Sequence, residues 1–180
     1  MTKLFVLLSI TAILTTGGCK KSNAEPAIPG NGPRTNVPAE FSGNWMYGNF
    51  SLTEYWSQDP ESYLGNALQF AFAFTFNSDG TYVQYFTSSS VTSGVVTYQQ
   101  SVTKGTVEIN TATKTIKTHP SASHYRRTSN GAVVEERDLR KEELSSATTY
   151  NFTTGTETSG SKALYLTLEG TQQPLTFLKK

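Results

Sequence analysis

Residues 68–76 constrain the fold most, because large apolar side chains alternate there with small or polar ones. Period two is the spacing of a β-strand, since successive side chains point to opposite faces of a sheet. We therefore expect one strand whose large side chains line the core or a cavity. If the other face meets solvent, a charge at Ala73 should do less damage than one at Phe72, and equal damage would indicate that both faces are buried. The large side chains are Leu68, Phe70, Phe72, Phe74 and Phe76.

Further short β patterns follow, separated by turn signals. Asp79-Gly80 predicts a three-residue hairpin loop with Gly80 left-handed, which places Tyr82 and Phe86 beside the phenylalanine face. A two-residue loop would place Val83 and Tyr85 there instead, since a slip of one residue reverses every side chain. Asn130-Gly131 predicts a second hairpin, and His119-Pro120 interrupts a run. The expected runs are 45–56, 68–76, 81–87, 95–100, 106–109, 113–118, 121–128, 132–139, 145–152, 162–168 and 174–178.

One short helix is expected between the first two strands. Asp59 is a suitable N-cap, Pro60 suits the first helical position, and Gly65 can end the helix after one or two turns. A chain with many short strands and one helix is typical of an all-β domain. We expect a single antiparallel barrel of about 8–10 short strands, with a β-sandwich as the alternative.

The N-terminus has the layout of a secretory signal in residues 1–18. Lys3 precedes an apolar run over residues 4–14, small residues follow, and Cys19 is the only cysteine. This pattern resembles the lipobox of bacterial lipoproteins, which implies cleavage before Cys19 and a diacylglyceryl group on its sulfur. The resemblance implies a protein anchored in the cell envelope, and Lys20 in place of an aspartate favours the outer membrane.

Residues 20–40 are expected to be a flexible tether, because they contain four prolines and few apolar side chains. The folded domain is then expected over residues 41–180. Removing residues 1–18 takes away Lys3 and no acid, so basic and acidic residues become equal in number. This balance argues against a nucleic-acid partner, which requires a basic surface.

A short motif opens the expected domain. Gly43-Asn44-Trp45 lies at the start of the first strand, and here the chain resembles the lipocalins and lipocalin-like barrels, whose first strand opens with Gly-x-Trp. In that group the tryptophan closes one end of the barrel, and the interior binds a small, usually apolar, ligand. The resemblance implies a structural role for Gly43 and Trp45 and a ligand cavity lined by the phenylalanine face.

Three other groups are candidates for function. Aromatic side chains near the short helix (Tyr55, Trp56 and Tyr63) suggest a platform for stacking on a glycan, although packing in the core is the simpler explanation. His119 and His124 are five residues apart, which would place them on opposite faces of a strand, so no metal site is expected. Residues 135–143 hold the most crowded carboxylates, but three basic residues accompany them, and Arg126 and Arg127 are expected to pair with them across the Asn130-Gly131 turn.

The sequence contains no Gly-x-Ser-x-Gly elbow, no phosphate-binding glycine loop and no His-Glu-x-x-His motif. We therefore expect neither an enzyme nor a cofactor. The first hypothesis is a lipid-anchored protein that binds a small apolar ligand in a barrel cavity. The alternative is a surface interaction or glycan-binding lipoprotein with a filled core. An open or a packed barrel interior distinguishes the two.

Overall fold

The computed structural model describes residues 32–64 and 69–180, which form one antiparallel sheet of nine strands. The strands are β1 (Gly43–Tyr47), β2 (Phe70–Phe76), β3 (Thr81–Thr92), β4 (Val95–Asn110), β5 (Thr115–Ser129), β6 (Ala132–Asp138), β7 (Thr148–Thr156), β8 (Lys162–Leu168) and β9 (Leu175–Lys179). The helices are α1 (Pro60–Leu64) and the 3₁₀ turn η1 (Lys141–Glu143). No helix within these ranges is long and apolar enough to cross a membrane.

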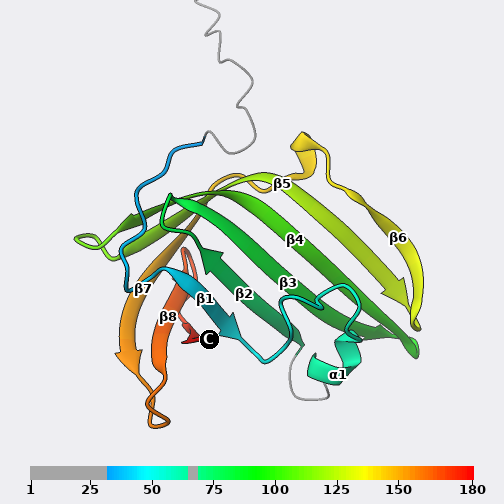
Figure 1. Ribbon diagram of the computed structural model, residues 1–180. Helices are drawn as coiled ribbons and strands as arrows, with labels where there is room; N and C mark the ends of the chain where they lie inside the picture. Colours follow the sequence, from blue (N-terminus) through cyan, green and yellow to red (C-terminus); the bar gives the residue numbers. More distant parts are fainter. Residues whose placement is uncertain (1–31, 65–68) are drawn as a thin grey trace, which may run out of the picture.

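The sheet closes on itself (Figure 1). Pairing runs in order from β1 to β5, passes to β7, β8 and β9, and returns to β1. Among the described residues, β6 pairs only with the second half of β5. The expected all-β barrel, with one short helix after its first strand, is confirmed. Asp59 also caps α1 as predicted, because its carboxylate accepts a hydrogen bond from the Glu61 N–H at 3.1 Å.

Strand β2 has the predicted period and register, within the described part of residues 68–76; Leu68 lies outside the described residues. Phe76 pairs with Tyr82 and Phe72 with Phe86, and Gly80 has a φ of 82°. The predicted three-residue loop is therefore confirmed. The Asp79 side chain stabilises this loop by accepting hydrogen bonds from the Thr81 N–H and hydroxyl, at 3.0 and 2.7 Å.

Several strands are longer than expected. The serine and threonine patch after residue 87 continues β3 to Thr92, and the turn falls at Ser93 and Gly94, both with positive φ. The two runs expected at 95–100 and 106–109 are one strand, β4, and the runs at 113–118 and 121–128 are one strand, β5. Small hydroxyl side chains fit a pleated surface, so continuous pairing with neighbouring strands overrides the lack of apolar residues.

A β-bulge on β5 explains why His119-Pro120 does not break that strand. Lys104 pairs with Ala122 and Gly105 with Pro120, which leaves Ser121 as an extra residue without an opposite partner. Proline has no N–H to donate to the ladder, so a bulge is one of the few places in a sheet where it fits. Gly105 is required opposite it, because a Cβ there would overlap the His119 carbonyl oxygen.

Strand β1 ends earlier than the expected run over residues 45–56. Gly48 has a φ of 93°, and the chain then folds back across the outer face of the barrel as residues 48–64. This segment packs its aromatic side chains on Ala71 and Ala73, which are fully buried. Both faces of β2 are therefore covered, and the alternative of a solvent-exposed alanine face is wrong.

The main core lies inside the barrel. Trp45 is 2 % exposed, and its indole N–H donates to the Phe41 carbonyl oxygen at 2.6 Å. Residues before 41 also belong to the folded part: Val37 is buried, and the Thr35 N–H donates to the Val107 carbonyl oxygen at 3.0 Å. The structured domain therefore begins before residue 41, inside the segment that its prolines suggested was all tether.

Candidate functional site

The phenylalanine face of β2 fills the barrel at one end. Phe72, Phe74 and Phe76 are buried, and the ring centroids of successive pairs lie 4.8 and 5.1 Å apart. The ring centroid of Phe177, on β9, lies 5.4 Å from that of Phe72. These residues form part of a packed aromatic core, and Phe70 stacks on Tyr47 at the same wall.

The rest of the barrel interior contains a hollow with a largely polar lining. Its volume is about 300 Å³, and its polar lining includes Gln84, Ser101, Thr103, Ser123 and Tyr125. The segment between β6 and β7 borders it. Hydroxyl and amide groups in this hollow suit a small polar molecule better than an apolar one.

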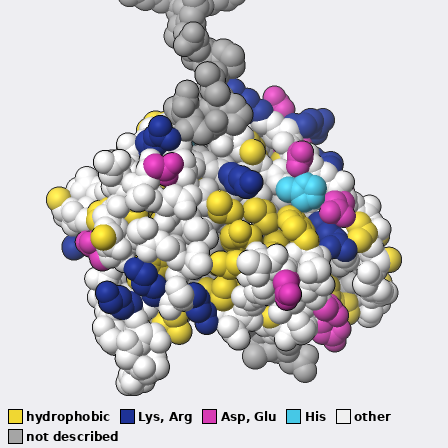
Figure 2. All heavy atoms as spheres, viewed as in Figure 1, with side chains coloured by type: hydrophobic (Ala, Val, Ile, Leu, Met, Phe, Trp, Pro, Cys, Tyr) yellow, Lys and Arg dark blue, Asp and Glu magenta, His cyan; other side chains and the backbone are white. Residues whose placement is uncertain are grey.

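A larger hollow is on the outside of the barrel, and we call it the outer groove. Its volume is about 660 Å³, and it lies between the segment of residues 48–64, the outer faces of β4 and β5, and the chain from Asp138 to Leu144. Figure 2 shows hydrophobic side chains gathered across the middle of this face, with basic, acidic and histidine side chains beside them. The lining includes Trp56, Val102, Lys104, His119, Ala122, His124, Asp138, Leu139, Lys141 and Leu144.

Trp56 is held in place from several sides. Its carbonyl oxygen accepts a hydrogen bond from the Arg126 guanidinium at 2.8 Å, and its ring meets the Tyr55 ring edge to face at 4.9 Å. The Tyr55 hydroxyl in turn donates to the Phe86 carbonyl oxygen at 2.6 Å and contacts the Thr87 hydroxyl at 2.9 Å. The Trp56 side chain thus stays partly exposed on a backbone fixed to the sheet.

The bulge brings both histidines to the outer groove. His119 lies opposite Thr106 and His124 opposite Val102, so the extra residue Ser121 places them on the same face. The prediction of opposite faces is wrong for this reason. Within the described ranges no three histidine, cysteine or acidic side chains are placed to hold a metal ion.

Each histidine is paired with carboxylates. His119 Nε2 lies 2.6 Å from Glu108 Oε2. His124 Nδ1 lies 2.8 Å from Asp138 Oδ1, and its Nε2 lies 3.4 Å from Glu136 Oε1. The hydrogen bond to Asp138 raises the pKa of His124, partial burial opposes this, and Glu136 adds to the increase.

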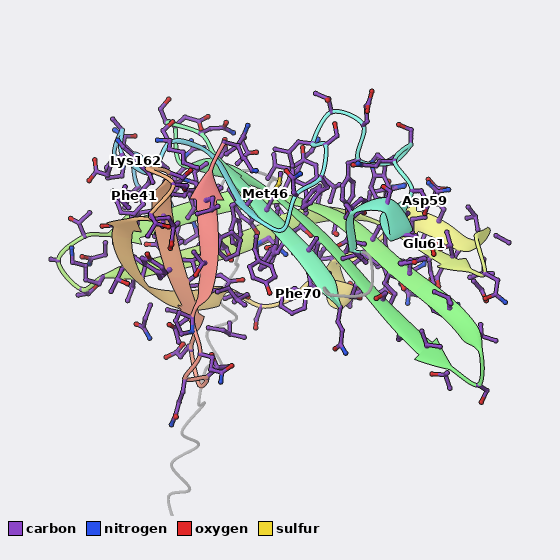
Figure 3. The ribbon with its side chains drawn as sticks, turned by 90° about the horizontal axis from the view of Figure 1, so that it is seen from below. Phe41, Met46, Asp59, Glu61, Phe70 and Lys162 are labelled. Carbon is purple, nitrogen blue, oxygen red and sulfur yellow. The ribbon has the colours of Figure 1, made fainter. Side chains whose placement is uncertain are left out.

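A third hollow lies on the other side of Trp56, with a volume of about 510 Å³. It is more polar, and Asp59, Glu61, Tyr98, Gln100 and Arg126 are among its lining residues. Figure 3 shows Asp59 and Glu61 side by side at α1, far across the barrel from Lys162. Trp56 therefore separates two hollows of different character.

The predicted aromatic platform is only partly at the surface. Tyr55 is 2 % and Tyr63 9 % exposed, and both hydroxyls lie 2.9 Å from the Thr87 hydroxyl. Burial raises the pKa of both tyrosines. Only Trp56 of the three lines the outer hollows.

The remaining predicted residues are placed as follows. Trp45 is in the barrel core, Gly43 has a φ of 107° at the start of β1, and Cys19 lies outside the described residues. The expected pairing of Arg126 and Arg127 with the acidic run is confirmed, since they lie opposite Glu136 and Glu135.

Sequence reasoning missed most of the outer groove. Val102 and Lys104 come from β4, Leu139 and Lys141 from the chain after β6, and nothing local in the sequence indicates that they meet. Pro120 within a strand pattern was the one available signal, because it pointed to a bulge and so to a change of face for His124.

Comparisons with protein families, curated proteins and solved structures find no match to this chain.

Proposed function

We propose that the protein is a lipid-anchored binding protein of the bacterial cell envelope that holds its ligand on the outer face of the barrel, around Trp56. The observation that carries this proposal is the position of Trp56, a partly exposed aromatic ring on a fixed backbone between two hollows. Indole rings supply a large contact area at small entropic cost, which suits recognition of a ligand. The packed phenylalanine face argues against an apolar ligand deep in the barrel.

Within the acidic run, Glu143 is engaged by two arginines. Glu143 accepts hydrogen bonds from the Arg137 guanidinium at 2.8 and 2.9 Å, and these contacts lower the pKa of Glu143 to about 2. A carboxylate with so low a pKa stays ionised at neutral pH and cannot act as a general acid there. Its role in our proposal is to fix η1 at the edge of the outer groove.

A second candidate is the binding of a small polar molecule in the hollow inside the barrel. The observation in its favour is the polar lining, in which Gln84 and Ser101 make no side-chain hydrogen bond within the described part of the chain. Both side chains are half-buried, and a polar ligand there would hydrogen-bond to them. This candidate differs from the apolar cavity that the sequence suggested.

Tryptophan fluorescence tests the proposal, because the chain has only two tryptophans and they differ in exposure. The mature chain with Cys19→Ser would be titrated with palmitate, N-phenyl-1-naphthylamine, maltooligosaccharides and N-acetylglucosamine oligomers. We expect at least one probe to change the emission saturably. The change should disappear in Trp56→Phe and persist in Trp45→Phe, provided that circular dichroism shows both variants folded.

Two results would contradict this proposal. If no probe binds, the outer face is not a site for these ligand classes and the proposal is dropped. If binding persists in Trp56→Phe but is lost in Gln84→Ala, the ligand is inside the barrel and the second candidate replaces the first.

A further inference from the structure

We infer that the outer groove binds a soluble amphipathic anion, whose apolar body lies against Trp56 and whose acidic group is held by Lys104 or Lys141. The inference rests on the proposed function in one respect, the choice of the outer face as the binding site. It adds the chemical class of the ligand.

The floor of the outer groove is apolar. Val102 of β4 and Ala122 of β5 form its sheet side, Leu139 and Leu144 come from the chain around η1, and Trp56 forms the opposite wall. Contact between these side chains and a flat or extended apolar group removes apolar surface from water, which favours binding. The volume, about 660 Å³, is within the range of small-molecule sites.

The charges at the rim are unequal in a way that favours an anion. Asp138 is occupied by His124 at 2.8 Å, and Glu108, beside the groove, is occupied by His119 at 2.6 Å. Neither Lys104 nor Lys141 has an acidic partner within 4.0 Å among the described residues. Both carboxylates are thus engaged by a histidine, whereas the two ammonium groups have no acidic partner among the described residues.

The same arrangement disfavours other ligands of this size. A cationic ligand would meet two lysines and no unpaired carboxylate in the lining. A neutral apolar ligand would leave the two ammonium groups hydrated, so the lysines would not contribute to its affinity. An anion with an apolar body uses both parts of the groove, and a charge-assisted hydrogen bond contributes more than a neutral one.

A matched pair of fluorescent probes tests the inference. 1-Anilinonaphthalene-8-sulfonate and N-phenyl-1-naphthylamine share one ring system, and only the first carries a negative charge. We expect the anionic probe to bind the mature Cys19→Ser chain with one-to-one stoichiometry and at least about tenfold more tightly than the neutral probe, the factor expected for one added charge-assisted contact. Added salt should weaken the anionic probe more, because exposed charges are screened.

Substitutions then locate the site. Lys104→Met and Lys141→Met should together reduce binding of the anionic probe about tenfold and leave the neutral probe unchanged. Both lysines are exposed, so the fold should tolerate the change. Lys162→Met is the matched control, since Lys162 is an exposed lysine on the far side of the barrel from α1 (Figure 3). Trp56→Ala should weaken the binding of both probes.

The outcomes separate the inference from the proposed function. Equal binding of the two probes, unaffected by the lysine substitutions but lost in Trp56→Ala, would overturn the inference and keep the outer face as a binding site. Binding unaffected by the Trp56 and lysine substitutions would overturn the inference as well, and would show that neither probe uses this groove.

Discussion

The indole of Trp56 and the imidazole of His124 meet edge to face, with ring centroids 5.1 Å apart and planes at 85°. His124 also binds Asp138 at 2.8 Å, so one histidine joins the segment over the barrel, strand β5 and the end of strand β6. Aromatic contacts of this geometry add about 0.5–1.5 kcal/mol to the burial of the rings. The protonation state of His124 therefore bears directly on how the wall of the outer groove is held.

We predict that His124 titrates above the ordinary histidine pKa of 6.5, because the hydrogen bond to Asp138 stabilises its charged form. Nuclear magnetic resonance titration of the His124 ring would measure this. Asp138→Asn should lower the pKa of His124 towards the ordinary value, and Glu136→Gln should lower it less. A pKa of His124 at or below 6.5 in the unsubstituted protein would contradict the pairing.

The same pKa difference gives stability a dependence on pH. Because the pKa of His124 is raised in the folded state, its contribution to the free energy of unfolding is complete below pH 6.5 and is lost as pH rises through the raised pKa. The side chain is 37 % exposed, so we expect the contribution to be below about 1 kcal/mol. The free energy of unfolding measured in urea should therefore differ between His124→Gln and the unsubstituted protein more at pH 5.5 than at pH 8.5.

Strand β2 should not tolerate a charge on either face. Phe72 is 8 % and Ala73 0 % exposed, and burial of an unpaired charge costs several kcal/mol. We expect Phe72→Asp and Ala73→Asp both to be largely unfolded by circular dichroism and thermal melting. Ser90→Asp is the control, because Ser90 is an exposed residue of β3, and this variant should have the melting temperature of the unsubstituted protein. A folded Ala73→Asp variant would show that residues 48–64 do not cover that face.

Gly105 should be irreplaceable at the bulge. A Cβ at this position would overlap the His119 carbonyl oxygen and come within 2.9 Å of the Tyr82 ring. Both obstacles are fixed by pairing or burial, so Gly105→Ala should lower the free energy of unfolding by more than about 3 kcal/mol. Urea denaturation would measure the loss, with Lys117→Ala on the exposed face of β5 as a near-neutral comparison.

Local signals predicted local structure well. Asp79-Gly80 predicted the loop and thereby the register of Phe76 with Tyr82, because a hairpin loop fixes the pairing of the two strands that it joins. Asp59 and Pro60 predicted the start of α1, because an N-cap and a proline at the first helical position act on the turn that they begin. These signals lie within a few residues of the structure that they determine.

Non-local structure was missed. The bulge at Ser121 depends on Gly105 across the sheet, so the face on which His124 lies could not be obtained from spacing along β5 alone. Burial of Ala73 depends on where Phe50 and Tyr55 pack after the chain turns at Gly48. The outer groove combines both effects, which is why composition and period gave no indication of it.

The anchor is tested separately from the fold. Because Cys19 follows a signal-like segment, the unsubstituted protein should fractionate with membranes and incorporate radiolabelled palmitate. Cys19→Ser should lose the label and leave the membrane fraction. Label that persists in Cys19→Ser would refute lipid attachment at this residue.

Strand β2 lies between two separate hydrophobic clusters, one inside the barrel and one beneath residues 48–64. Its amide protons are therefore shielded twice, by hydrogen bonds to β1 and β3 along its edges and by packed side chains on both faces. For these amides to exchange with solvent deuterium, both clusters must separate, so their exchange should report the global unfolding of the domain. Strand β6 pairs on one side only and should exchange first, long before the barrel opens.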